Sequence, residues 1–226
     1  MPPLSSSDPA PRRLSPDNTP PPAGQTDRAA RGLDLALCAF AFVVFGPFFL
    51  VAATLIRLED GGPVFFRQER LGRGRQSFAI LKFRTMLDGK EITRAGRWLR
   101  RTGLDETAQF FNVLRGDMRV VGPRPLTAAD VARLGWEDAR FDGRWAAPPG
   151  ITGLAQVFGG RSARHSRRLD ELYARRRSPA LDAWLVGVSF AMNLGGKGRV
   201  RALLRRARRR RAAARAGRLL LSTRHR

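Results

Sequence analysis

Two adjacent carboxylates, Asp105 and Glu106, lie in the middle of a chain that is otherwise strongly basic. A carboxylate can attack phosphorus to form an acyl phosphate, and a neighbouring carboxylate can hold Mg²⁺. Five cations flank the pair: Arg97, Arg100, Arg101, Arg115 and Arg119. A diphosphate substrate would need such cations, whereas a solvated pair of acids would not. The pattern is typical of phosphoryl transfer; the alternative is that Asp105 caps a helix and Glu106 lies in its first turn.

A rigid turn, "GPRP" at residues 122–125, follows this pair. Pro123 and Pro125 fix the backbone on both sides of Arg124. A guanidinium held in one geometry suits bidentate recognition of phosphate oxygens. The turn therefore predicts a second group that faces an anionic substrate.

The composition favours an anionic partner. The 226 residues carry 42 Lys and Arg against 19 Asp and Glu, which gives a formal net charge of +23. Nucleic acid, acidic lipid and phosphorylated substrates all match this excess. The chain lacks a recognisable nucleic-acid motif and interleaved aromatic residues, so no nucleic-acid partner is expected. The single cysteine, Cys38, excludes an intrachain disulfide.

An uncharged stretch, Leu35 to Ile56, is long enough for a membrane. As a straight helix it would extend about 33 Å, which matches the bilayer core. Gly46 and Pro47 interrupt it, and proline breaks the backbone hydrogen bonding of a helix. Basic residues flank both ends, which favours a cytoplasmic location for each: Arg28, Arg31, Arg57, Arg67 and Arg70. A single span and a re-entrant hairpin both remain open on these residues.

The remaining chain predicts an α+β protein, mostly helical with a small β-hairpin. The apolar runs 64–66 and 78–83 predict the hairpin. Helices are expected at 92–103, 105–115, 166–176 and 180–195, and a loop with a strand at 148–161. The predicted segments are 1–28 (disordered), 29–58 (a membrane segment), 59–196 (a mixed soluble domain) and 197–226 (an arginine-rich tail suited to anionic lipid).

Three long blocks, taken in order, resemble the bacterial sugar transferases, the monotopic phosphoglycosyl transferases. They are "GPVFFRQERLGRGRQSFAILKFRTM" (62–86), "ITRAGRWLRRTGLDETAQFFNVLRGDMRVVGPRPL" (92–126) and "PGITGLAQVFGGR" (149–161). The resemblance implies transfer of a sugar-1-phosphate from a UDP-sugar to polyprenyl (undecaprenyl) phosphate, with release of UMP. This reaction starts lipid-linked glycan assembly, as in capsule or exopolysaccharide synthesis, in the inner leaflet on the cytoplasmic face of the bacterial inner membrane.

The resemblance also implies residue roles. Asp105 would be the nucleophile that carries a covalent phosphosugar, and Glu106 the Mg²⁺ ligand. Lys82 and Arg100 would neutralise phosphate or orient the pair. The implied substrate-binding residues are Arg124 with Pro123 and Pro125, together with Gln156 and Arg161. Pro47 matches the break of the family's membrane hairpin. The resemblance therefore favours a membrane-embedded re-entrant helix hairpin over the span at 29–58, followed by a cytosolic catalytic domain at 59–196.

Some residues depart from the family pattern, and other functions compete. "DETAQ" stands where "DELPQ" is common, and Gly46 precedes Pro47 where serine is usual. One competing hypothesis is a membrane-tethered basic protein that binds acidic partners without catalysis. Another is an interaction subunit that has lost catalysis, which the intact Asp105–Glu106 pair disfavours. A homodimer is compatible with an enzyme at a membrane surface.

Overall fold

The computed structural model describes residues 25–87, 91–159, 162–196, 198–204 and 206. Most of the segment predicted to be disordered, the substrate-binding candidate Arg161 and most of the arginine-rich tail lie outside these residues.

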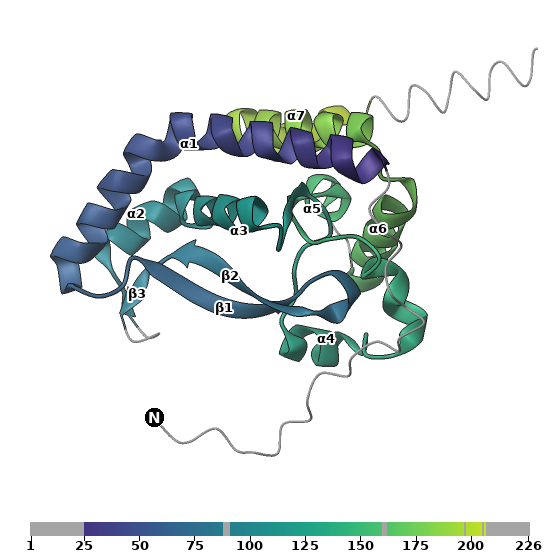
Figure 1. Cartoon of the computed structure of the whole chain (residues 1–226), viewed down its shortest axis with the longest axis horizontal. Coiled ribbons are helices and arrows are strands. Elements are labelled where there is room, and N and C mark those ends of the chain that lie inside the picture. Colours follow the sequence, from purple (N-terminus) through teal and green to yellow (C-terminus); the bar gives the residue numbers. More distant parts are fainter. Residues whose placement is uncertain (1–24, 88–90, 160–161, 197, 205, 207–226) are drawn as a thin grey trace, which may run out of the picture.

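The longest element is helix α1, Gln25–Asp60, which contains the whole uncharged stretch. Its course bends part-way along (Figure 1), and Pro47 lies inside it. Proline is a common cause of such bends because it removes one hydrogen bond and crowds the preceding turn. The interruption expected at Pro47 is therefore accommodated within one continuous helix. Among the described helices, this one, from Arg28 to Asp60, is long and apolar enough to cross a membrane.

Both ends of α1 dock onto the same domain. Near its start, the guanidinium of Arg31 donates to the carbonyls of Val113 and Leu114 at the end of helix α3, Gln109–Arg115. At its other end, the carboxylate of Glu59 accepts from the backbone N–H of Ala95, 2.9 Å away, in the first turn of α2, Arg94–Thr102. The domain thus holds α1 on each side of the uncharged stretch.

A buried ionic network joins α1 to the rest of the chain. Arg119 begins strand β5, Arg119–Val121, and contacts two carboxylates: Asp34 of α1 at 2.9 Å and Asp182 at 2.8 Å. Asp182 lies on α7, Pro179–Gly195. Tyr173 of α6, Ala163–Arg176, donates its hydroxyl to Asp182. Because buried charges need partners, this network fixes four elements relative to one another.

The described strands form three two-stranded sheets. Strands β1, Phe65–Leu71, and β2, Ser77–Phe83, pair antiparallel around the short 3₁₀ turn η2, Arg73–Arg75, and confirm the predicted hairpin. β3, Met86–Leu87, pairs with β4, Glu91–Ile92. β5 pairs in parallel with β6, Gly150–Thr152. This last pairing joins segments far apart in the sequence and was not predicted.

The predicted helices at 92–103, 166–176 and 180–195 are confirmed as α2, α6 and α7. Two expectations were wrong. The Asp105–Glu106 pair lies in a 3₁₀ turn, η3, Leu104–Ala108, so the α-helix predicted from Asp105 begins only at Gln109. The loop expected after β6 contains a short helix, α5, Leu154–Phe158. The other short helices are α4, Ala128–Leu134, and η4, Ala139–Arg144.

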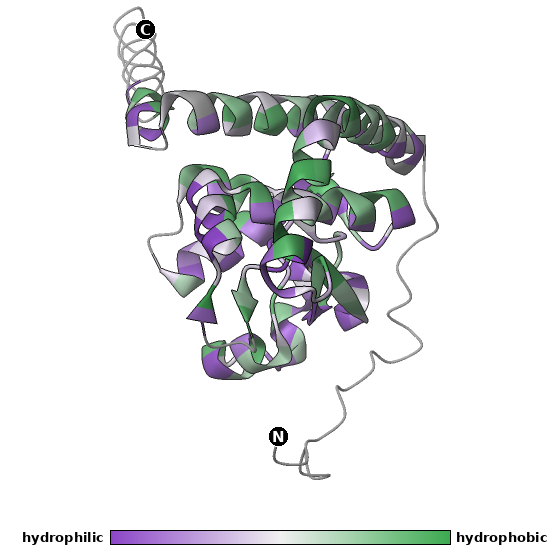
Figure 2. Ribbon diagram, turned by 90° about the vertical axis from the view of Figure 1, so that its left-hand side faces the viewer, coloured by the Kyte–Doolittle hydropathy of each residue, from purple (hydrophilic) through white to green (hydrophobic). Residues whose placement is uncertain are grey.

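The elements form layers. α1 and α7 lie side by side in one layer, with α2 and α3 beneath α1 and the β1–β2 hairpin beyond them (Figure 1). Figure 2 shows that this upper layer is rich in hydrophobic residues. Large apolar side chains of α1 are exposed, including Phe40, Val43, Leu50 and Leu58. The architecture is α+β, mostly helical with small sheets, as predicted.

Asn112 of α3 fixes the distance between that helix and the hairpin. Its side chain is fully buried, accepts from the N–H of Leu81 at 2.9 Å and donates to the carbonyl of Ala79 at 2.7 Å. The amide therefore pairs with strand β2 as a neighbouring strand would. Because α3 follows directly on η3, this contact also places the Asp105–Glu106 pair beside Lys82 of β2.

We expect Asn112→Ala to destabilise the fold by about 2–4 kcal/mol, because buried polar groups of β2 lose their partners. Urea unfolding in detergent would measure this loss. Asn193→Ala, at an exposed position on α7, is the matched control and should leave stability unchanged. Equal stability of the two variants would contradict the structural role of Asn112.

Candidate active site

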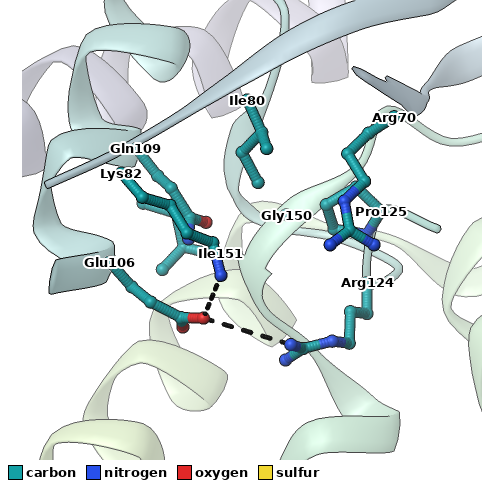
Figure 3. Close-up of a pocket in the computed structure, with 9 residues that line it drawn as sticks. All are labelled: Arg70, Ile80, Lys82, Glu106, Gln109, Arg124, Pro125, Gly150 and Ile151. Carbon is teal, nitrogen blue, oxygen red and sulfur yellow. Dashed lines mark hydrogen bonds and ion pairs between the residues drawn. The ribbon is translucent and has the colours of Figure 1, made fainter. Parts of the chain in front are cut away.

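A polar pocket opens where the hairpin, η3, the turn after β5 and strand β6 meet (Figure 3). Three of its residues are cationic and one is acidic. The lining residues are Arg70, Ile80, Lys82, Glu106, Gln109, Arg124, Pro125, Gly150 and Ile151. The excess of positive charge makes the pocket suited to an anionic ligand.

Glu106 lies between two of these cations. Its carboxylate contacts the Lys82 ammonium at 3.0 Å and lies 4.0 Å from the Arg124 guanidinium (Figure 3). The cations come from separate elements, strand β2 and the turn after β5. The structure thus brings together three of the residues that the sequence singled out.

Asp105 precedes Glu106 in η3 and is half-buried. Burial, and the adjacent negative charge of Glu106, raise the pKa of the Asp105 carboxyl above its ordinary value, while the charges of Lys82 and Arg100 oppose this rise. Asp105 does not cap a helix, since Gly103 occupies the position before η3 and no side chain caps that turn. A perturbed carboxylate beside a cationic pocket is typical of a functional group.

Arg100 lies near the pair without forming a hydrogen bond to it in the described structure. Its guanidinium donates to the hydroxyl of Thr85 at 2.9 Å. Its charge nevertheless reaches Asp105 and lowers the pKa of that carboxyl. Arg100 therefore acts on Asp105 through its charge and not through a described hydrogen bond.

Close backbone contact between two glycines, Gly122 and Gly150, joins the turn after β5 to β6 beside the pocket. The N–H of Gly122 donates to the carbonyl of Thr152 at 2.8 Å, and that of Gly150 to the carbonyl of Pro123 at 2.9 Å. A Cβ added to Gly150 would lie 2.0 Å from the backbone nitrogen of Gly122, so only glycine permits this approach. The crossing leaves Pro123 and Pro125 buried and Arg124 exposed.

Sequence reasoning missed Arg70, which lines the same pocket from β1. Its guanidinium donates to the side-chain oxygen of Gln68 at 2.6 Å and lies 3.4 Å from Asp130. Burial lowers the pKa of Arg70, and the charge of Arg124 acts in the same direction. The strand register would have identified Arg70, because Arg70 pairs with Phe78 and therefore lies on the same face of the hairpin as Lys82.

Other predicted site residues lie elsewhere. Gln156 is on α5 and does not line the pocket, although its amide lies near Gly153, just after β6. Pro47 is in α1, and Pro123 is buried within the turn and does not line the pocket.

The Asp105–Glu106 pair has a donor set that fits Mg²⁺. Among the described residues, no group of three or more His, Cys, Asp or Glu side chains could hold a metal. Mg²⁺ does not require one, since it binds through one or two carboxylates together with substrate phosphates and water. The pair supplies this kind of partial site.

Residues 25–195 match the family model described as bacterial sugar transferase. The chain belongs to this family. Membership accounts for the three sequence blocks that surround the pocket of this sugar transferase.

Three of the curated relatives match between 59% and 70% of the chain. It is 42% identical over 153 residues to the UDP-glucose:undecaprenyl-phosphate glucose-1-phosphate transferase of Caulobacter vibrioides, covering 62% of this chain and 57% of the relative. It is 40% identical over 146 residues to the UDP-N-acetylgalactosamine-undecaprenyl-phosphate N-acetylgalactosaminephosphotransferase of Aeromonas hydrophila. This match covers 59% of this chain and 34% of the relative. The exopolysaccharide production protein ExoY of Rhizobium meliloti is 34% identical over 188 residues, which cover 70% of this chain and 82% of the relative. The chain thus spans just over half of the Caulobacter relative and about a third of the Aeromonas relative.

The raised pKa of Asp105 predicts a stability gain on its removal. In the unfolded chain the pKa of an aspartate is about 3.9. At a higher pH, folding must therefore bury a charge that the unfolded chain leaves in water. We expect Asp105→Asn to raise the midpoint of thermal unfolding at neutral pH, and the gain to vanish as pH falls below about 4. Melting curves across this range would measure it, with the exposed acid variant Glu137→Gln as control. A loss of stability at neutral pH would contradict the prediction.

Proposed function

We propose that this sugar transferase is an undecaprenyl-phosphate sugar phosphotransferase that takes a sugar-1-phosphate from a UDP-sugar and releases UMP. The observation that carries the proposal is the carboxylate of Glu106 held between Lys82 and Arg124, directly beside Asp105. A nucleophile next to a cluster of cations is what attack on a diphosphate needs. The names of the relatives support both substrates and a role in exopolysaccharide synthesis.

The proposed reaction has two displacements at one phosphorus atom. The Asp105 carboxylate attacks the phosphorus that carries the sugar and forms an acyl phosphate. The anhydride bond to the uridine-side phosphate breaks, and UMP leaves with the electron pair. An oxygen of polyprenyl phosphate then attacks the same phosphorus, which restores the Asp105 carboxylate and gives a polyprenyl-diphosphate sugar.

Several cations of the pocket would neutralise the negative charge of the substrate phosphates. Lys82 and Arg124 face Glu106, and Arg70 faces the pocket from β1, so the donor diphosphate would enter among three positive groups. Arg100 would favour the ionised form of Asp105, and the buried Pro123 and Pro125 would hold Arg124 at the donor nucleotide. Glu106 would hold Mg²⁺, which stabilises negative charge on phosphate oxygens when bound.

Two further residues are proposed to bind substrate. The amide nitrogen and oxygen of Gln156 are buried and have no hydrogen-bond partner within the described part of the chain. Buried polar groups normally have partners, so this amide is available to a ligand that reaches the β5–β6 crossing. Arg161 follows in the same sequence block and would contact a substrate phosphate.

The membrane helix is proposed to be re-entrant. α1 docks at Arg31 and at Glu59 onto the same domain, which supports placing both ends on the cytoplasmic side. A straight span would place them on opposite sides of the bilayer. The exposed apolar side chains of α1 would enter the inner leaflet, and the basic tail would contact anionic headgroups.

Purified protein with Mg²⁺, polyprenyl phosphate and a panel of UDP-sugars should release UMP with one donor. Asp105→Asn should lower the rate by at least about a thousandfold, because the nucleophile is lost. Glu137→Gln, at an exposed site, should keep the wild-type rate. A fully active Asp105→Asn variant would exclude the covalent route. Silence across the panel in folded wild-type protein would favour a basic binding protein without catalysis.

Cysteine labelling tests the re-entrant helix. With Cys38 replaced by alanine, Arg28→Cys reports the start of α1 and Glu69→Cys reports the catalytic domain; both positions are exposed. We expect a membrane-impermeant maleimide to label both in inverted vesicles and neither in intact spheroplasts. Labelling of Arg28→Cys in spheroplasts would instead show that α1 spans the bilayer.

A further inference from the structure

A second ion pair lies beneath the turn that carries Arg124. The guanidinium of Arg144, at the end of η4, contacts the carboxylate of Asp170 of α6 at 2.9 Å. The two residues are only 2% and 3% exposed. A second nitrogen of the same guanidinium donates to the backbone carbonyl of Arg124. Neither Arg144 nor Asp170 lines the pocket.

Aromatic rings hold the Arg144 guanidinium in place. It lies over Trp145 at 4.7 Å from the ring centroid and over Trp136 at 5.7 Å. Both tryptophans are buried in a cluster with Leu71 and Val131. Cation–π contacts of this kind are strongest where water is excluded. The donor to Arg124 therefore has little freedom to move.

A pair this deeply buried is not explained by stability alone. Burial lowers the pKa of Arg144 and raises that of Asp170 to about 6, so the surroundings disfavour both charges. Well-packed apolar residues in place of a buried pair are often equally stable or more so. A hydrogen bond that apolar residues could not replace would account for this ion pair. The described structure shows one, from the Arg144 guanidinium to the Arg124 carbonyl.

The turn depends on this contact because its other backbone links lie on either side of Arg124. The carbonyl of Pro123 is held by Gly150, and the carbonyl of Leu126 by the N–H of Leu71 at 2.8 Å. Pro125 has no N–H to contribute. Among the described contacts, Arg144 is thus the group that fixes the peptide between Arg124 and Pro125.

We propose that Arg144 and Asp170 are positioning residues that set the Arg124 guanidinium opposite Glu106 through the Arg124 backbone. Asp170 orients Arg144, Arg144 holds the carbonyl, and the two prolines transmit that restraint to the side chain. Arg124 is 59% exposed at its side chain, so its direction is set mainly by its backbone. The activity consequence rests on the proposed function, whereas the backbone restraint does not.

The test replaces the whole pair with apolar residues, Arg144→Met with Asp170→Leu, which avoids leaving one charge buried alone. We expect kcat/KM for the UDP-sugar to fall about tenfold to a hundredfold, the scale of a small misplacement in a site. On an Arg124→Met background, the same replacement should change kcat/KM by less than about twofold, because contacts that act through one residue are not additive. Equal losses on both backgrounds would overturn the proposal.

The matched control is Arg167→Met with Glu171→Leu, an ion pair on the same helix α6. Arg167 also lies over an aromatic ring, that of Phe141, at 4.9 Å. Neither Arg167 nor Glu171 has a described hydrogen bond to Arg124, so this control should leave kcat/KM unchanged. A loss equal to that of the Arg144–Asp170 replacement would show a general effect on folding and overturn the proposal.

Amide hydrogen exchange separates this proposal from the proposed reaction. Replacing the Arg144–Asp170 pair should speed exchange in the peptide that contains Gly122, Arg124 and Leu126, with strand β2 unchanged. Unchanged exchange in that peptide would overturn the proposal. If wild-type protein releases no UMP, the proposed reaction fails, while the exchange result still decides whether the pair restrains the turn.

Discussion

Arg119 shares its guanidinium between the carboxylates of Asp34 and Asp182, and the architecture is arranged around this contact. An isolated buried charge would be very costly, so each of the three groups requires the others. Burial raises the pKa of Asp182, and its hydrogen bonds to Tyr173 and Arg119 oppose that rise. Because Arg119 begins the strand that leads into the "GPRP" turn, helix α1 and the candidate active site are joined through one strand.

The pocket is assembled from short elements, each of which supplies one or two groups. The hairpin supplies Lys82 and Arg70, η3 supplies Glu106, and the β5–β6 crossing supplies Arg124. None of these elements would be stable alone, since short turns and two-stranded ribbons bury too little surface. Side-chain contacts across elements replace that missing stability, such as the amide of Asn112 on strand β2.

Local sequence predicted the elements that Gly or Pro residues delimit. The hairpin and helices α2, α6 and α7 were found in this way. The helix predicted at 105–115 was less accurate, because its first residues form the 3₁₀ turn η3, and the apolar Leu114 near its end is 42% exposed. The buried face instead carries Gln109, Asn112 and Val113. Contacts between distant segments decide such positions, and one sequence does not reveal them.

The candidate site residues were also found only where residue type or resemblance was enough to identify them, and not where contacts between distant segments decide the position. Lys82, Glu106 and Arg124 were identified by residue type and by resemblance, whereas Arg70 depended on strand register. The Arg144–Asp170 pair joins positions 26 residues apart. Each looks like an ordinary surface charge in the sequence, and only the tertiary structure buries them together.

The docking of both ends of α1 onto one domain also affects how the chain enters a membrane. Moving a charged flank such as that of Arg31 or Glu59 through hydrocarbon is the slow and costly part of inserting a spanning helix. In the proposed re-entrant arrangement both flanks stay on one side, so no such transfer is required. The apolar residues would only partition into the nearer leaflet, while the polar flanks fold onto the domain that is already in water.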